Sequence, residues 1–120
     1  MTEDKDNQVQ QEINKAINFL GQNKFLEAEN TCLKIIDLGD NADAYHILSS
    51  IKIYQQEFDD SIRYVKKSIE INDGNPGYHV TLGCAYSAKK DYDSSVIAFK
   101  SAIKINNKIA QVHFYLGESY

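Results

Sequence analysis

The sequence predicts an all-α solenoid of antiparallel helix pairs, with about seven helices in 120 residues. Three observations lead to this fold class. Apolar and small residues recur in one pattern at an interval of about 34 residues, as they do in repeat proteins. Within each period the apolar residues are three or four positions apart, as on a helix with one buried face. Turn-forming residues separate these stretches, and no stretch alternates apolar and polar residues as a strand does.

The repeat is clearest near the end of the chain. The pattern Leu-Gly-x-x-Tyr at 82–86 returns one interval later at 116–120. Counting back by the same interval, Phe99 aligns with Val65, and a further interval, shorter by one position, leads to Cys32. One pattern of aromatic, aliphatic and small residues therefore runs through the chain about three and a third times.

The helices of the first half are expected at 9–21, 25–38, 42–55 and 58–72. The second of them carries Phe25, Ala28 and Ile35 at helical spacing and ends before the turn residues Gly39-Asp40-Asn41. The fourth carries a stripe of Ile62, Val65 and Ile69. Asp59 is placed to cap or favour the start of this helix through exposed N–H groups.

The later helices are expected at 76–89, 92–105 and 110–120. Pro76 suits a first helical position, where its missing N–H costs nothing. Val96, Phe99 and Ile103 form the stripe of the next helix, and Asp93 has the role of Asp59 there. The last helix restarts the pattern and the chain stops before its partner helix. We expect a piece of a longer repeat protein, with self-association through this open helix as a by-product; the alternative is that the open face docks on another copy.

These helices divide the chain into a polar N-terminal tail and one array. The tail is expected at 1–8 and the array at 9–120, with units 9–41, 42–75 and 76–109 and the first helix of a fourth unit at 110–120. Connections of about 2–6 residues make consecutive helices antiparallel. Small residues such as Ser49 and Gly83 should let paired helices approach each other, while Phe99 and Tyr92 should fill the remaining space.

Charge and cysteine content limit the function classes. The chain has 17 Asp and Glu against 13 Lys and Arg, a net charge of −4, which argues against a binder of nucleic acid or of anionic membranes. Its polar start lacks the features of a secretory signal, and no stretch is apolar enough to span a membrane. Cys32 and Cys84 form no CxxC pair that would suggest a disulfide framework or zinc site. We expect a cytoplasmic protein.

The residues at the repeat positions resemble those of the tetratricopeptide repeat family, whose unit is a helix–turn–helix of the same length. The unit 76–109 matches best, with His79, Leu82, Gly83, Tyr86, Asp91, Tyr92, Ser95, Phe99 and Ala102. The resemblance covers about 9–120. Two departures are clear: Asp40, Asp73 and Asn107 replace the terminal proline, and Lys52 replaces a tyrosine, which should weaken one packing contact.

The resemblance implies a right-handed superhelix whose first helices line a concave groove that holds a peptide or another protein. The groove positions of the family correspond here to Ile13, Ile17, Leu20, Asp43, His46, Ser50, Ile53, Tyr54, Val80, Cys84, Ser87, Phe114 and Glu118. This surface is mostly apolar and nearly neutral. It should suit an extended or helical segment with apolar anchors better than an acidic tail.

Binding of acidic chaperone tails is not expected. Family members that bind such tails resemble one another in a clamp of Lys, Asn and Arg side chains. The matching positions in this chain are Ile13, Ile17, Ile47, Gly77 and Thr81. None of these side chains has an N–H group to donate to a carboxylate.

No residue is predicted to be catalytic or to bind a metal or cofactor. His79 and His113 occupy the aromatic packing position of the repeat, and His46 is interpreted as a solvated neighbour of Tyr45. Asp59-Asp60 is better explained as a helix start than as a metal site, because no further oxygen ligands follow at loop spacing. Ser, His and Asp occur without a nucleophile motif.

The sequence thus predicts a non-catalytic module that binds a protein or peptide. Two alternatives stay open. The chain could be the N-terminal regulatory or substrate-recruiting arm of a larger enzyme, such as a bacterial glycosyltransferase or sulfotransferase, with catalysis beyond Tyr120. It could also be a self-assembling scaffold whose apolar end faces join copies head to tail.

Overall fold

The computed structural model describes residues 2–106, with side chains for 6–106. These residues form six α-helices joined by short turns, and this part of the chain contains no strand. The helices are α1 (Thr2–Gly21), α2 (Phe25–Leu38), α3 (Ala42–Tyr54), α4 (Phe58–Ile71), α5 (Pro76–Ala88) and α6 (Tyr92–Ile105). The helix expected at 110–120 lies outside the described residues.

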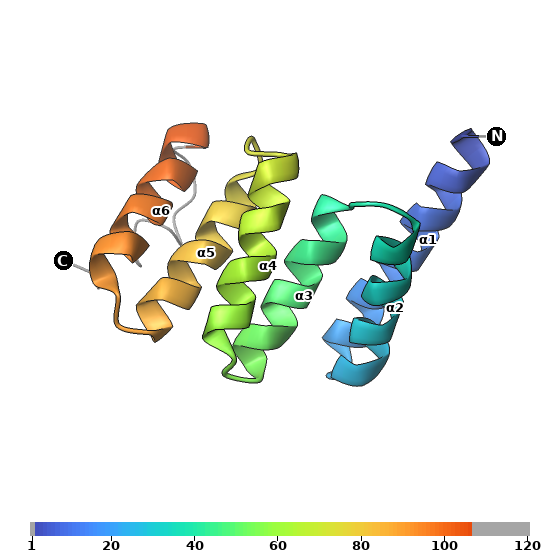
Figure 1. Ribbon diagram of the computed structural model, residues 1–120, viewed down its shortest axis with the longest axis horizontal. Coiled ribbons are helices and arrows are strands. Elements are labelled where there is room, and N and C mark those ends of the chain that lie inside the picture. Colours follow the sequence, from blue (N-terminus) through green and yellow to red (C-terminus); the bar gives the residue numbers. More distant parts are fainter. Residues whose placement is uncertain (1, 107–120) are drawn as a thin grey trace.

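The six helices form three antiparallel pairs that follow one another along the long axis (Figure 1). Helix α3 contacts α1 on one side and α5 on the other, so the first helices of the pairs form one layer. The second helices, α2 and α4, each pack against the first helix of the following pair. This arrangement confirms the predicted all-α solenoid.

Helix α1 is longer than expected. It begins at Thr2, whereas the sequence predicts a polar tail before a helix starting near residue 9. Its N-terminal turns extend beyond the end of α2, at the right of Figure 1. The other helix boundaries agree with the predictions to within one residue.

Side chains cap three of the helices. Asn41 accepts a hydrogen bond from the N–H of Ala44 at the start of α3. Asn75, the residue before α5, accepts one from the N–H of Gly77 in the first turn of that helix. Asp91 accepts one from Ser94 at the start of α6. Asp59 and Asp93, which were predicted to cap or favour the starts of these helices, lie within the first turns of α4 and α6, where a negative charge interacts favourably with the helix dipole.

The turns inside the three pairs have the same backbone structure. Asn23, Gln56 and Lys90 have φ angles of 61°, 61° and 67°, in the left-handed region that ends many helices. In each turn the next N–H donates back across the helix end: Lys24 to Phe19, Glu57 to Lys52 and Asp91 to Tyr86, at 2.8, 2.8 and 2.9 Å. The repeat predicted from side chains is therefore also a repeat of backbone hydrogen bonds.

Small residues lie where paired helices cross. The Oγ of Ser49 donates to the carbonyl of Ser61 at 2.8 Å, and the Oγ of Ser95 donates to the carbonyl of Gly83 at 3.0 Å. All four residues are buried. The two bonds join equivalent positions of successive helix pairs, which confirms that these small positions allow close helix approach.

The larger core residues follow the prediction with one exception. Phe99, Leu48 and Cys32 are fully buried, and burial raises the pKa of the Cys32 thiol to about 12, so this thiol is unreactive at neutral pH. Tyr92 was expected to fill the core, but it is 47% exposed. It is the first residue of α6, the last helix of the described array.

Lys52 links the first pair of helices to the second. Its side chain is only 14% exposed, and its Nζ lies 3.4 Å from Glu29 of α2 and 3.2 Å from Glu57. Burial acts to lower the pKa of Lys52, but the two carboxylates favour the charged ammonium more strongly, and the pKa is raised. The packing contact expected to be weakened here is replaced by ion pairs.

Candidate functional site

The candidate site is the face of α1, α3 and α5 that carries the predicted groove residues. Phe114 and Glu118 lie outside the described residues. On the remaining positions the structure gives three levels of exposure. Ile17, Asp43 and Tyr54 are exposed and Ile13 is buried. The other positions are half-buried, namely Leu20, His46, Ser50, Ile53, Val80, Cys84 and Ser87.

Ile13 does not belong to an accessible groove. Its side chain is 3% exposed and is part of the core cluster that includes Ala44, Ile47 and Leu48 of α3. A partner could reach almost none of it. The physical reason is that α1 packs against α3, so the side chain at this point of α1 is used to join the two helices.

A polar network joins α3 to α5. The hydroxyl of Tyr78 donates to Oδ1 of Asp43 at 2.6 Å. Nε2 of His46 lies 2.8 Å from Oγ1 of Thr81, and the His46 and Tyr78 rings are 4.9 Å apart between centroids. Asp43 and His46 are thus brought together, and both are held by residues of the next helix pair.

Tyr78 was missed by the sequence analysis. Its side chain is buried at 2% exposure, and the pKa of its hydroxyl is raised first by burial and then by its bond to Asp43. The available signal was the sequence separation of Asp43 and Tyr78, which is one position more than the repeat interval. Such pairs occupy neighbouring positions on successive first helices, where side chains can meet.

The environment of His46 predicts a stability change in mild acid. Burial lowers the pKa of His46 below the ordinary 6.5, although Asp43 acts in the opposite direction. The unfolded chain therefore takes up this proton first, and stability should fall as the pH decreases from 6.5 towards the lower folded-state pKa. His46→Gln, which can still bond Thr81, should show a smaller loss in urea unfolding across this range. An unchanged pH dependence would contradict this assignment.

The other end of the same face is apolar. Tyr54, at the end of α3, stacks on Phe25 of α2 with ring centroids 5.3 Å apart. Tyr54 is still 66% exposed, and Ile17 of α1 is 53% exposed. Since α1 and α3 run in the same direction, the face has a polar part near the start of α3 and an apolar part near the ends of α1 and α3.

Among residues 6–106, no three His, Cys, Asp or Glu side chains are arranged to hold a metal ion. None of the helices within 2–106 combines the length and the apolar character needed to cross a bilayer.

Paired helices in register, with the first helices forming one continuous face, define a helical-repeat protein of the α-solenoid class. Two segments, 42–75 and 76–109, match the sequence model of the tetratricopeptide repeat and together make up more than half of the chain. The chain belongs to the tetratricopeptide repeat family. In sequence, no curated protein matches it.

Several solved structures share the fold. MamA has a TM-score of 0.86 at 20% identity, and the alignment covers 93% of this chain and 66% of MamA. A mutant of the Thermobaculum terrenum O-GlcNAc transferase has a TM-score of 0.88 at 16% identity, covering 92% of this chain and 22% of the transferase. The first repeat domain of Spaghetti (RPAP3), bound to the HSP90 peptide SRMEEVD, has a TM-score of 0.87 at 14% identity, covering 92% and 89%. At these identities the likeness concerns the fold.

Proposed function

We propose that the chain is a non-catalytic module that binds a protein or peptide on the face of α1, α3 and α5. The observation that carries this proposal is the exposure of Ile17 and Tyr54 on that face. Large apolar side chains that remain accessible next to polar groups are typical of binding surfaces. The peptide bound to the similar domain of Spaghetti supports the general class of partner.

The partner that this face suits is a segment with apolar anchors. An anchor would contact Tyr54 and Ile17, and a polar group would meet Asp43 at the other end. An acidic tail fits poorly, because Ile13 and Ile47 of the family's clamp positions are buried and Asp43 would repel a carboxylate. We further propose that the module works in the cytoplasm.

The role of an arm in a larger enzyme is the second candidate. It is supported by the similarity to the O-GlcNAc transferase, of which the alignment covers only 22%. In that case the same face would recruit a substrate protein and the chemistry would take place in another part of the enzyme. Both candidates require binding by the same surface, so one experiment tests that shared requirement.

The test begins with peptides selected from a random displayed library against the full chain. Their affinity is then measured by fluorescence anisotropy for the wild type and for the Ile17→Ser/Tyr54→Ala variant. We expect the double variant to bind at least about tenfold more weakly, because an interfacial tyrosine contributes about 2 kcal/mol or more when it anchors a ligand.

Ile97→Ser is the matched control. Ile97 is as exposed as Tyr54 but lies on α6, away from the proposed face, so this substitution should leave the affinity unchanged. Circular dichroism should show equal helicity for all three proteins. Equal binding by wild type and double variant would rule out this face as the binding site.

A further inference from the structure

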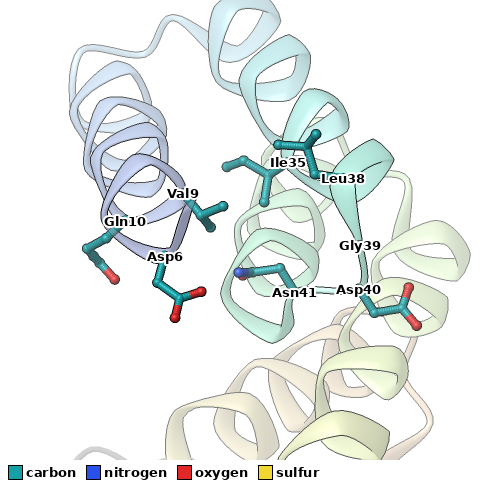
Figure 2. Close-up of a pocket in the computed structure, with 8 residues that line it drawn as sticks. All are labelled: Asp6, Val9, Gln10, Ile35, Leu38, Gly39, Asp40 and Asn41. Atoms are coloured by element: carbon teal, nitrogen blue, oxygen red, sulfur yellow. The ribbon is translucent and has the colours of Figure 1, made fainter. Parts of the chain in front are cut away.

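A cleft opens where α1 extends beyond the rest of the array. It encloses about 340 Å³ between the N-terminal half of α1 and the connection from α2 to α3 (Figure 2). Its lining residues are Asp6, Val9, Gln10, Ile35, Leu38, Gly39, Asp40 and Asn41. The cleft exists because α1 starts at Thr2, ahead of the predicted repeat, so its extra turns form one wall.

The floor of the cleft is apolar and accessible. Ile35 is buried and Val9 half-buried, whereas Leu38 is 60% exposed. A second hollow of about 300 Å³ shares these three residues and continues along α1 and α2. Leu38 thus lines both hollows. An apolar side chain of a partner could cover it there.

The rim of the cleft is acidic. Asp6 and Asp40 line it, and Oδ1 of Asp40 already accepts a bond from the hydroxyl of Tyr45 at 3.0 Å. No described residue that lines this cleft carries a positive charge, whereas the adjoining hollow is lined by one residue of each sign, Glu12 and Lys34. The start of α3 is also near, but a helix N-terminus is equivalent to only about half a positive charge and Asn41 caps it, so two carboxylates dominate.

We propose that this cleft is a second docking site, which takes a basic amphipathic segment of a partner protein. An apolar side chain of the segment packs on Leu38 and Val9, and Lys or Arg groups meet Asp6 and Asp40. Charge complementarity selects this occupant. A second copy of this chain is disfavoured, because each copy carries a net charge of −4. The site goes beyond the proposed function, which uses another surface.

The test uses two short synthetic peptides and the full chain. One peptide places Leu on one helical face and Lys on the other, and the second has Glu in place of every Lys. Anisotropy titrations should show binding of the Lys peptide that weakens with added salt, and at least about tenfold weaker binding of the Glu peptide. In NMR spectra of the wild type, the Lys peptide should shift amides within 6–10 and 35–41.

Two variants test the two halves of the cleft. Leu38→Ser should weaken binding of the Lys peptide by about tenfold, through loss of the apolar contact. Asp6→Asn/Asp40→Asn should weaken it by about three- to tenfold, and Asn at 40 can still accept the bond from Tyr45. The matched controls are Leu26→Ser, a similarly exposed leucine of α2, and Asp93→Asn, an exposed carboxylate of α6.

The outcomes separate this site from the proposed groove. Equal binding of the two peptides overturns the cleft proposal, as does an equal loss with Leu26→Ser, since binding would then be unspecific. Loss of Lys-peptide binding in Ile17→Ser/Tyr54→Ala but not in Leu38→Ser also overturns it, and places the peptide on the groove face. If circular dichroism shows that Leu38→Ser unfolds, the carboxylate variant and the amide shifts decide.

Discussion

Replacement of Gly83 by Ala should destabilise the protein by about 1–3 kcal/mol, as overpacking of a core does. A Cβ atom on Gly83 would lie 2.6 Å from Cδ1 and 2.8 Å from Cζ of Phe99, whose ring is fully buried and cannot turn aside into solvent. Alanine favours a helix over glycine by about 1 kcal/mol, so the measured loss is what remains after this gain. Urea unfolding near neutral pH measures it.

Gly21→Ala is the matched control for this substitution. Gly21 is the last residue of α1, and a Cβ there would meet no atom within 4 Å. The control should be neutral or slightly stabilising. In the Gly83→Ala background, Phe99→Leu should recover part of the lost stability, because the smaller side chain vacates the position of the new methyl group. Equal effects of the two glycine substitutions would show that α5 and α6 do not approach as closely as described.

The parts of the fold that were predicted correctly are those encoded by local spacing. Stripes such as Ile62, Val65 and Ile69 mark a helix without reference to the rest of the chain. The equivalence of Ser49 with Gly83 follows from a repeat that places both at a helix crossing. These signals need only the interval of the repeat and the period of a helix.

The features that were missed depend on contacts between helices. Residues 2–8 form the start of α1, but they are polar and carry no apolar stripe that would distinguish a helix from a tail. Ile13 was assigned to the groove by alignment with later units, yet at this point α1 packs on α3. The burial of Lys52 is explained by its ion pair with Glu29 of α2. Neither the period of a helix nor the repeat interval relates these two positions.

On the face of α1, α3 and α5, too, local signals could be predicted and contacts between helices could not. Tyr54 and Ile17 were identified from their repeat positions and are exposed in the structure. Tyr78 was not, because its importance comes from Asp43 and His46 of the preceding pair. A contact between two units gives no pattern in the sequence of either unit alone. The way in which α5 is held against α3 therefore had to come from the structure.

Tyr78→Ala should be the most destabilising single substitution on this face, at about 3–5 kcal/mol, because it removes a buried aromatic ring and leaves a cavity between α3 and α5. Tyr78→Phe keeps the ring and removes only the hydroxyl that donates to Asp43, so it should cost about 1.5–3 kcal/mol. Urea unfolding of the wild type and both variants separates the two contributions.

The difference in stability between Tyr78→Ala and Tyr78→Phe shows whether ring packing or the hydrogen bond to Asp43 holds α5 against α3. Asp43 is exposed, so water can replace the lost hydrogen bond, and the Phe variant should lie nearer the lower end of its range. If Tyr78→Phe were as damaging as Tyr78→Ala, the polar network rather than ring packing would fix α5 against α3. If instead both variants were as stable as the wild type, α5 would be held without Tyr78, and the spacing of the face would depend on contacts between α4 and α5 alone.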